Sequence, residues 1–294
     1  MNRKRAFRIS LFLLSLALLA VAIWLLGPFG PEARSAAVSQ AVETGLRESA
    51  ASIGLPLTAN AAEVLTYTGF ALKYNEQYEQ AEWVAYQLTD DEVHGQYDRS
   101  DDFRADLNVR TGSADPSDYR GSGFDRGHLA PAGDMKWSSA AMRESFLMSN
   151  MSPQDPGFNR GIWRKLEEQV REWAEEDTEL FVVTGPVLTD GPYDQIGENG
   201  VAVPKRFYKV LLDYREPELK AIGFVLPNAS SSLPLSAFAV TVDLVESLTG
   251  LDFFVALPDT IEEQLESRVD LPLWELEPAG ITGAETSAGE PRGP

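Results

Sequence analysis

Residues 121–131 read Gly-Ser-Gly-Phe-Asp-Arg-Gly-His-Leu-Ala-Pro, and this run places an acid, a guanidinium and an imidazole between glycines. Glycines permit the tight backbone turns that bring such groups together. Hydrolysis of a phosphodiester needs a base for water, positive charge for the phosphate and a divalent ion for the developing oxyanion. His128 and Arg126 are candidates for the first two roles.

The chain contains only two histidines and no cysteine. The absence of cysteine excludes a disulfide scaffold, a zinc-thiolate site, an iron-sulfur cluster and a cysteine nucleophile. A histidine by itself is more often a structural or surface residue, and we interpret His94 in that way. His128 is the stronger candidate because the residues around it carry complementary chemistry.

A second informative segment is the helix predicted over residues 159–174, in which apolar residues recur at helical spacing. Asn159 opens this helix, where an asparagine can serve as an N-cap and also as a metal ligand. One such ligand can suffice, since Mg²⁺ keeps most of its waters and accepts only one or two protein groups. Glu167 lies two turns further along the same face, and its alternative interpretation is a solvated helix residue. Trp163 and Trp173 belong to the apolar stripe and are predicted core residues.

The remaining segments predict one α+β domain with a central antiparallel sheet flanked by helices. Residues 90–119 are polar and rich in Asp, Gly, Ser and Pro, which predicts a long irregular excursion. Strands are expected over residues 64–72, 83–88, 180–184, 206–214 and 219–226, and further helices over 138–147 and 240–249. The predicted organisation is a leader over 1–34, a linker over 35–61, the catalytic domain over 62–272 and a disordered tail over 273–294.

The leader has the features of a membrane anchor. Four basic residues precede an uncharged, apolar run over residues 9–26, which is close to the shortest length that spans a bilayer. We therefore expect an N-terminal transmembrane signal anchor with the remaining chain outside the cytoplasm, in the cell envelope or periplasm. The alternative is a cleaved signal peptide, with a cleavage site near residues 33–36 and a secreted product.

The formal net charge of −20 conflicts with nucleic-acid binding, because an acidic protein repels a polyanion at long range. Screening confines such fields to about 8 Å at physiological salt. A local basic cleft inside an acidic shell is therefore compatible with the composition, and its candidates are Arg99, Arg110, Arg120, Arg126, Arg160, Arg164 and Arg171.

Several segments in order resemble the DNA/RNA non-specific endonucleases of the ββα-metal class. They are residues 119–128 (YRGSGFDRGH), 149–154 (SNMSPQ), 158–163 (FNRGIW), 166–167 (LE) and 183–186 (VTGP), with a further echo at 240–243 (VTVD) and 249–251 (TGL). The resemblance covers most of the chain after the leader. It implies the ββα-metal nuclease fold, in which a strand hairpin carries the histidine and a helix carries the metal ligand.

The resemblance also implies a role for each matched residue. His128 would activate the attacking water, Arg126 would contact phosphate, and Asn159 would bind Mg²⁺ (or Mn²⁺). Glu167 would assist the hydrated ion.

Three further residues match the family pattern less closely. Asn150 falls where the family places an asparagine that supports the site, Arg171 matches an arginine near the leaving phosphate, and Arg99 resembles an upstream arginine that approaches the scissile phosphate. We interpret Asp125 as a residue that braces the turn through backbone or arginine hydrogen bonds.

The expected function is hydrolysis of phosphodiester bonds in DNA and RNA without sequence preference, by a one-metal mechanism with a histidine general base. The general base must be neutral, so activity should fall as the pH drops through the pKa of His128, which is near 6.5 if unperturbed. The expected partners are DNA, RNA, the membrane through the N-terminal segment, and a second copy of the chain in a homodimer. The alternatives are a hydrolase of another phosphodiester and a catalytically silent protein that holds nucleic acid at the membrane.

Overall fold

The computed structural model describes residues 54–57, 63–215 and 217–279. The predicted anchor, most of the linker and the end of the tail lie outside these residues. The chain divides into two compact units between Ile53 and Gly54, and all the described residues belong to the second unit. None of the helices in the described ranges has the length and apolar character that crossing a membrane requires.

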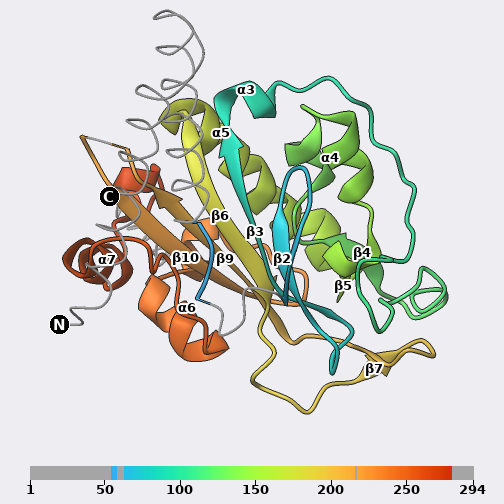
Figure 1. Ribbon diagram of the computed structural model, residues 1–294. Helices are drawn as coiled ribbons and strands as arrows, with labels where there is room; N and C mark the ends of the chain where they lie inside the picture. The colour runs from blue at the N-terminus through green and yellow to red at the C-terminus, as the bar shows by residue number, and fades with distance from the viewer. Residues whose placement is uncertain (1–53, 58–62, 216, 280–294) are drawn as a thin grey trace, which may run out of the picture. The chain divides into compact units, whose positions relative to one another are not determined.

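A seven-stranded antiparallel sheet forms the centre of the fold, with the strand order β1-β2-β3-β6-β9-β10-β11 (Figure 1). This confirms the predicted central antiparallel sheet. Its strands are β1 (Val64–Thr66), β2 (Ala71–Asn75), β3 (Gln80–Thr89), β6 (Glu179–Pro186), β9 (Arg206–Asp213), β10 (Lys220–Pro227) and β11 (Ala239–Val240). Two pairs of antiparallel strands lie outside it. The first, called the β4–β5 hairpin below, pairs β4 (Asp125–His128) with β5 (Met151–Gln154) across a long connection, and the second pairs β7 (Gln195–Ile196) with β8 (Val201–Ala202).

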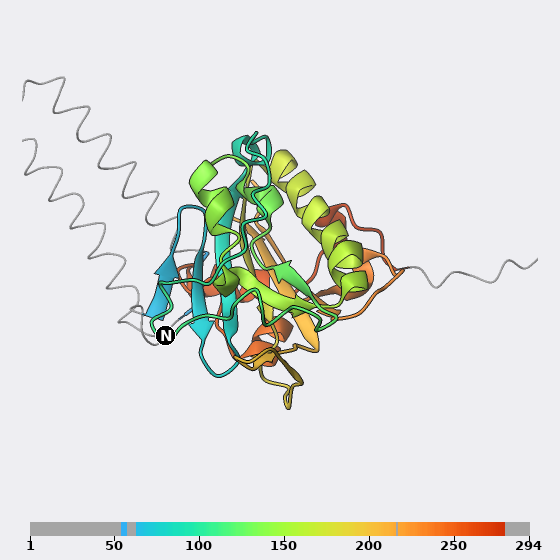
Figure 2. The same ribbon diagram turned by 90° about the vertical axis from the view of Figure 1, so that its right-hand side faces the viewer.

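Helices cover both faces of the sheet. One face carries α3, α4 and α5 together with the β4–β5 hairpin, and the opposite face carries α6 and α7 (Figures 1 and 2). The α-helices are α3 (Asp90–Val93), α4 (Ser139–Glu144), α5 (Arg164–Asp177), α6 (Val242–Thr249) and α7 (Asp259–Glu266). The shorter helical turns are η2 (Ala132–Met135), η3 (Met148–Asn150), η4 (Phe158–Trp163), η5 (Leu235–Phe238) and η6 (Leu271–Trp274).

The tryptophans mark the core beneath α5. Trp163 and Trp173 are 0% and 1% exposed, which confirms their prediction as core residues. Trp274 is equally buried, and its backbone oxygen accepts a hydrogen bond from Trp173 Nε1 at 3.0 Å. The turn η6 thus crosses residue 272, the predicted end of the domain, and the indole of Trp274 completes this core.

Two predicted elements are divided in the structure. Residues 64–72 form not one strand but β1 and the start of β2, because the chain turns between Tyr67 and Phe70, where the Tyr67 N–H donates to the Phe70 oxygen. The helix predicted over 159–174 is interrupted at Gly161, whose φ of −109° and ψ of −111° are not helical. The turn η4 therefore precedes α5 and gives Asn159 a separate backbone setting.

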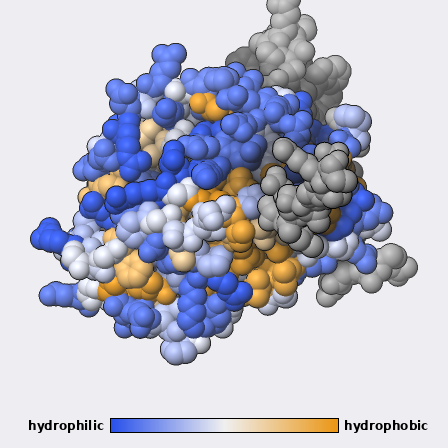
Figure 3. Space-filling view, turned by 180° about the vertical axis from the view of Figure 1, so that it is seen from behind, coloured by the Kyte–Doolittle hydropathy of each residue, from blue (hydrophilic) through white to orange (hydrophobic). Residues whose placement is uncertain are grey.

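Other boundaries follow local chemistry. The Ser138 hydroxyl accepts a hydrogen bond from the Ala141 N–H and caps α4. Gly250, at φ 73°, ends α6 in the left-handed conformation that glycine tolerates. The face shown in Figure 3 is mostly hydrophilic, with a smaller apolar area near its centre.

Candidate active site

The β4–β5 hairpin presents the predicted catalytic run. His128 pairs with Met151, and Gly127 pairs with Ser152. A Cβ on Gly127 would lie only 2.1 Å from the side chain of Gln154, which is fully buried, so a larger residue at 127 would have to displace Gln154. Gly121 and Gly123 both adopt positive φ angles before the hairpin begins, a conformation that other residues rarely adopt.

Asn150 fixes the chain on either side of this hairpin. The side chain is fully buried. Its Oδ1 accepts from the Ala130 N–H, and its Nδ2 donates to the Ala130 and Ser145 oxygens, each at 2.9 Å. All these partners are backbone atoms, so the amide joins the segment after His128 to the segment before β5 and is placed to support the site, not to contact a substrate.

His128 lies in an aromatic cage. The ring is 4.8 Å from the Phe146 centroid and 5.8 Å from Phe103, and the residue is only 8% exposed. Its Nε2 has no hydrogen-bond partner within the described residues. Burial, followed by the charges of Arg99 and Arg126, lowers the pKa of His128 to about 3. The ring is therefore neutral at neutral pH, and it does not titrate near 6.5, the value expected for an unperturbed histidine.

Two arginines flank this cage. The Arg126 guanidinium lies 4.1 Å from the centroid of the Phe103 ring, and that of Arg99 lies 4.8 Å from the centroid of the Phe146 ring. Both phenylalanines contact the imidazole. The structure thus brings Arg99, which is remote in the sequence, to the same site as Arg126. The Arg99 guanidinium also donates to Asp101 Oδ1 at 2.6 Å.

Asn159 is attached to the strand that carries His128. Its Nδ2 donates to Asp125 Oδ2 at 2.9 Å, and Arg160 donates to both oxygens of the same carboxylate, at 2.8 and 2.6 Å. Asp125 therefore braces the site through an arginine, as predicted, and also holds the amide. Since a strand rises about 3.3 Å per residue, the Cα atoms of Asp125 and His128 are roughly 10 Å apart.

Asn159 does not fill the alternative role of a helix N-cap. The capping carboxylate belongs to Asp155, whose Oδ1 accepts from the N–H groups of Gly157 and Phe158 at 2.8 and 3.1 Å. Because its Nδ2 is bound to Asp125, Asn159 has its carbonyl oxygen left as a neutral, hard donor. This is the oxygen chemistry that Mg²⁺ prefers, so Asn159 fits such an ion.

Glu167 is half-buried and is not the solvated helix residue of the alternative interpretation. Burial raises its pKa to about 7, the charges of Lys209 and Arg171 lower it, and Asp134 raises it. Arg171 donates to Asp134 Oδ1 at 2.7 Å, and Tyr86 donates to the other oxygen of Asp134 at 2.8 Å. These groups therefore form a network of charges in which Arg171 pairs with Asp134.

Sequence reasoning missed Lys209, as it missed Asp134 and Tyr86. Lys209 is fully buried on β9, and its Nζ lies 4.9 Å from the centroid of the Trp163 ring with no hydrogen-bond partner within the described ranges. Burial lowers its pKa to about 8, against the opposing charge of Glu167. A signal existed, because a lysine interrupts the apolar run of residues 206–213 (RFYKVLLD).

The other predicted residues lie in different settings. His94 is exposed and pairs with Asp90 at 3.2 Å, which fits an incidental role. Of the arginines proposed for a basic cleft, Arg160 and Arg164 are paired with Asp125 and Glu168. The positive charge nearest to the imidazole therefore comes from Arg99 and Arg126.

The site combines a buried, neutral imidazole on a short hairpin with two flanking guanidiniums. An aspartate of the same hairpin holds an asparagine that lies ahead of a helix. This arrangement agrees with the match to a known family. The chain belongs to the DNA/RNA non-specific endonuclease family, whose model matches residues 49–260. This membership confirms the resemblance found in the sequence motifs.

Individual nucleases are similar over much of the chain. The mitochondrial nuclease EXOG of Mus musculus is 37% identical over 245 residues, which cover 77% of this chain and 66% of that protein. Mitochondrial endonuclease G of Homo sapiens is 37% identical over 217 residues, covering 69% and 72%. The chain thus spans slightly less than two thirds of the length of the EXOG relative.

A solved structure supports the same fold. The crystal structure of the EndoG/EndoGI complex, described as showing the mechanism of EndoG inhibition, contains a chain that matches with a TM-score of 0.65 at 34% identity. The match covers 71% of this chain and 91% of that one. The mixed α and β architecture around a central antiparallel sheet is therefore shared with a family member.

Proposed function

We propose that this chain is an endonuclease that hydrolyses phosphodiester bonds of DNA and RNA without sequence preference, with Mg²⁺ or Mn²⁺ as its metal. The carrying observation is the setting of His128, a buried imidazole whose neutral form is favoured by burial and by two adjacent guanidiniums. Family membership supports the reaction class, and the nucleases EXOG and endonuclease G support the substrate class by similarity.

The first role is that of the general base. A neutral imidazole accepts a proton from the attacking water, and His128 is neutral at any pH well above 3. Arg126 and Arg99 lie beside the same aromatic cage, where their charges suit contacts with the non-bridging oxygens of a phosphate. Base and phosphate contacts therefore converge on one side of the hairpin.

The second role is metal binding. Asn159 would hold the ion through its carbonyl oxygen, because Asp125 keeps its Nδ2 occupied. When bound, Mg²⁺ would supply positive charge that stabilises the oxyanion developing on the phosphate. Glu167 contributes negative charge to the same region, Lys209 and Arg171 oppose its protonation, and Asn150 positions the hairpin.

The acidic composition limits where nucleic acid can bind. Exposed charges further apart than about 8 Å are largely screened at physiological salt. Binding therefore depends on the local charges of Arg99 and Arg126 and should weaken with added salt, with a slope set by these few phosphate contacts.

The N-terminal residues extend the proposal to location. We propose that residues 9–26 act as a signal anchor and that the catalytic domain works outside the cytoplasm, or is secreted if the leader is cleaved. Assembly into a homodimer stays a prediction.

The test incubates the full chain with plasmid DNA and with RNA, in Mg²⁺ or in chelator. We expect cleavage of both polymers only with the metal. His128→Ala should lower the rate about 10²- to 10⁴-fold, and the matched control His94→Ala should leave it unchanged, since His94 is exposed and pairs with Asp90. Absence of Mg²⁺-dependent cleavage of either polymer, or full activity of His128→Ala, would overturn the proposal.

A further inference from the structure

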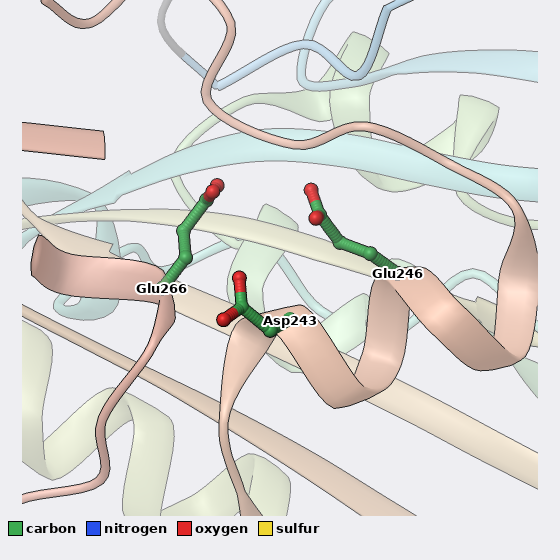
Figure 4. Close-up of side chains that lie close together, drawn as sticks. All are labelled: Asp243, Glu246 and Glu266. Carbon is green, nitrogen blue, oxygen red and sulfur yellow. The ribbon is translucent and has the colours of Figure 1, made fainter. Parts of the chain in front are cut away.

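Three carboxylates converge on the face of the sheet opposite to the candidate active site. Asp243 and Glu246 lie on α6, and Glu266 is the last residue of α7. Each offers one oxygen, and these three oxygens lie within 4.8 Å of one another. Figure 4 shows the carboxylates of the two helices facing a common space. Asp243 and Glu246 share one helix face because they are three residues apart.

The spacing suits a single ion. Calcium takes oxygen ligands at about 2.3 to 2.6 Å, so two oxygens on opposite sides of one ion are about 4.6 to 5.2 Å apart, and other pairs are closer. Asp243 is exposed, Glu246 is half-buried and Glu266 is buried. Protein oxygens would therefore contact the ion from the inner side, while water completes the coordination from the exposed side.

Glu266 supplies an independent observation that points to a ligand. It is only 5% exposed, and its Oε1 has no hydrogen-bond partner within the described residues. A buried polar atom without a partner is costly in free energy. The carboxylate of Glu266 belongs to the converging group, so the unpartnered side chain is directed at the space that an ion would occupy.

The electrostatic surroundings are one-sided. None of the three carboxylates forms a salt bridge with a lysine or arginine within residues 63–215 and 217–279. Burial, followed by the charges of Glu246, Glu262, Asp243 and Asp252, raises the pKa of Glu266 to about 9. Among the described residues, the Phe253 N–H is the only hydrogen-bond donor to these carboxylates, and it donates to Glu246 Oε1 at 2.8 Å. A cation would supply the missing positive charge.

We propose that Asp243, Glu246 and Glu266 bind one divalent cation of the calcium type and that this ion joins α6 to α7. The site is separate from Asn159 and would act on stability, not on the chemical step. With three protein carboxylates and water as ligands, the expected dissociation constant is on the order of 10⁻⁴ M.

Thermal unfolding of the full chain tests the site in an Asn159→Ala background, which removes the ligand proposed for the catalytic metal. In chelator-treated protein, Ca²⁺ at about 100-fold above the dissociation constant should raise Tm by about 5 °C. Adding Glu266→Gln should abolish this rise. Without Ca²⁺ the Glu266→Gln chain should be at least as stable as its parent, because an uncharged amide replaces a carboxylate crowded by other acids.

Glu263→Gln is the matched control, since Glu263 lies exposed on the same helix, and it should keep the full response. Equilibrium dialysis with radioactive calcium should find one ion per Asn159→Ala chain and none after Glu266→Gln is added. An equal rise in Tm with and without Glu266, or no calcium response in the Asn159→Ala chain, would overturn the proposal. Neither result depends on nuclease activity, so failure of the catalytic proposal is distinguishable.

Discussion

The hydrogen bond between Asn159 and Asp125 gives a sharp prediction for metal binding. Asp125 accepts three hydrogen bonds, one from Asn159 Nδ2 and two from Arg160. In Asp125→Asn, the new side chain has one oxygen and one NH₂ group in place of two oxygens. It cannot accept all three hydrogen bonds, because its NH₂ group faces the donors of Asn159 or Arg160. The orientation of the Asn159 side chain should therefore be lost in part, while the hairpin keeps its backbone pairing.

The magnitude follows from the position of Asp125 behind a metal ligand. Removing a residue that orients a ligand typically costs 10- to 100-fold in metal affinity or activity, or about 1.4 to 2.7 kcal/mol. We expect the Mg²⁺ concentration for half-maximal activity to rise by about this factor. The maximal rate at saturating Mg²⁺ should fall much less, because His128 and its flanking arginines are unchanged.

The assay measures initial rates of plasmid cleavage over a Mg²⁺ titration. The control is Arg160→Gln, which removes the exposed ion pair but leaves the bond from Asn159 to Asp125. It should shift the Mg²⁺ requirement much less than Asp125→Asn does, because exposed ion pairs contribute little. An Asp125→Asn enzyme with the wild-type Mg²⁺ requirement would refute the assigned orientation of Asn159.

Three further predictions concern buried groups. The pKa of His128 falls from 6.5 to about 3 on folding, so its contribution to stability is complete above pH 6.5 and is lost as pH falls toward 3. His128→Phe should therefore reduce the slope of unfolding free energy against pH in that window by about 1.4 kcal/mol per pH unit. Equal slopes for the two proteins in urea unfolding would contradict this. Lys209→Met removes the charge that lowers the pKa of Glu167, so the acid limb of the activity profile should move up by about one pH unit, whereas the exposed control Lys205→Met should not move it. Asn150→Ala leaves the Ala130 N–H and two carbonyls without partners and should lower stability by about 3 kcal/mol, which an unchanged Tm would disprove.

The fold was predictable where sequence patterns are local. Strand alternation indicated most strands of the central sheet, and the helices predicted over 138–147 and 240–249 contain α4 and α6. The hairpin turn after Thr66 was missed because Tyr67 and Phe70 continue the aromatic, strand-like composition. The burial of Trp274 was missed because its partner Trp173 is about a hundred residues away, and periodicity carries no information on such contacts.

The candidate site was predictable as a set of residue types but not as a network. Motif resemblance selected His128, Asn159 and Glu167. It did not indicate that the Asp125 carboxylate would accept a hydrogen bond from Asn159. It also did not indicate that the charge of Lys209, on β9, would interact with that of Glu167. The pKa of His128 depends on Phe103, Phe146 and Arg99, which come from separate segments. Such effects depend on three-dimensional burial.

The central claim is that His128 and Asn159 face one metal ion. The most direct measurement is a crystal structure of the full chain grown with Mn²⁺, in which anomalous scattering locates the ion. We predict a peak within bonding distance of Asn159 Oδ1, about 2.2 Å as for hard oxygen donors, on the side of the hairpin that carries His128. A well-ordered Asn159 with no peak beside it, while Mn²⁺ supports full cleavage activity, would contradict the claim.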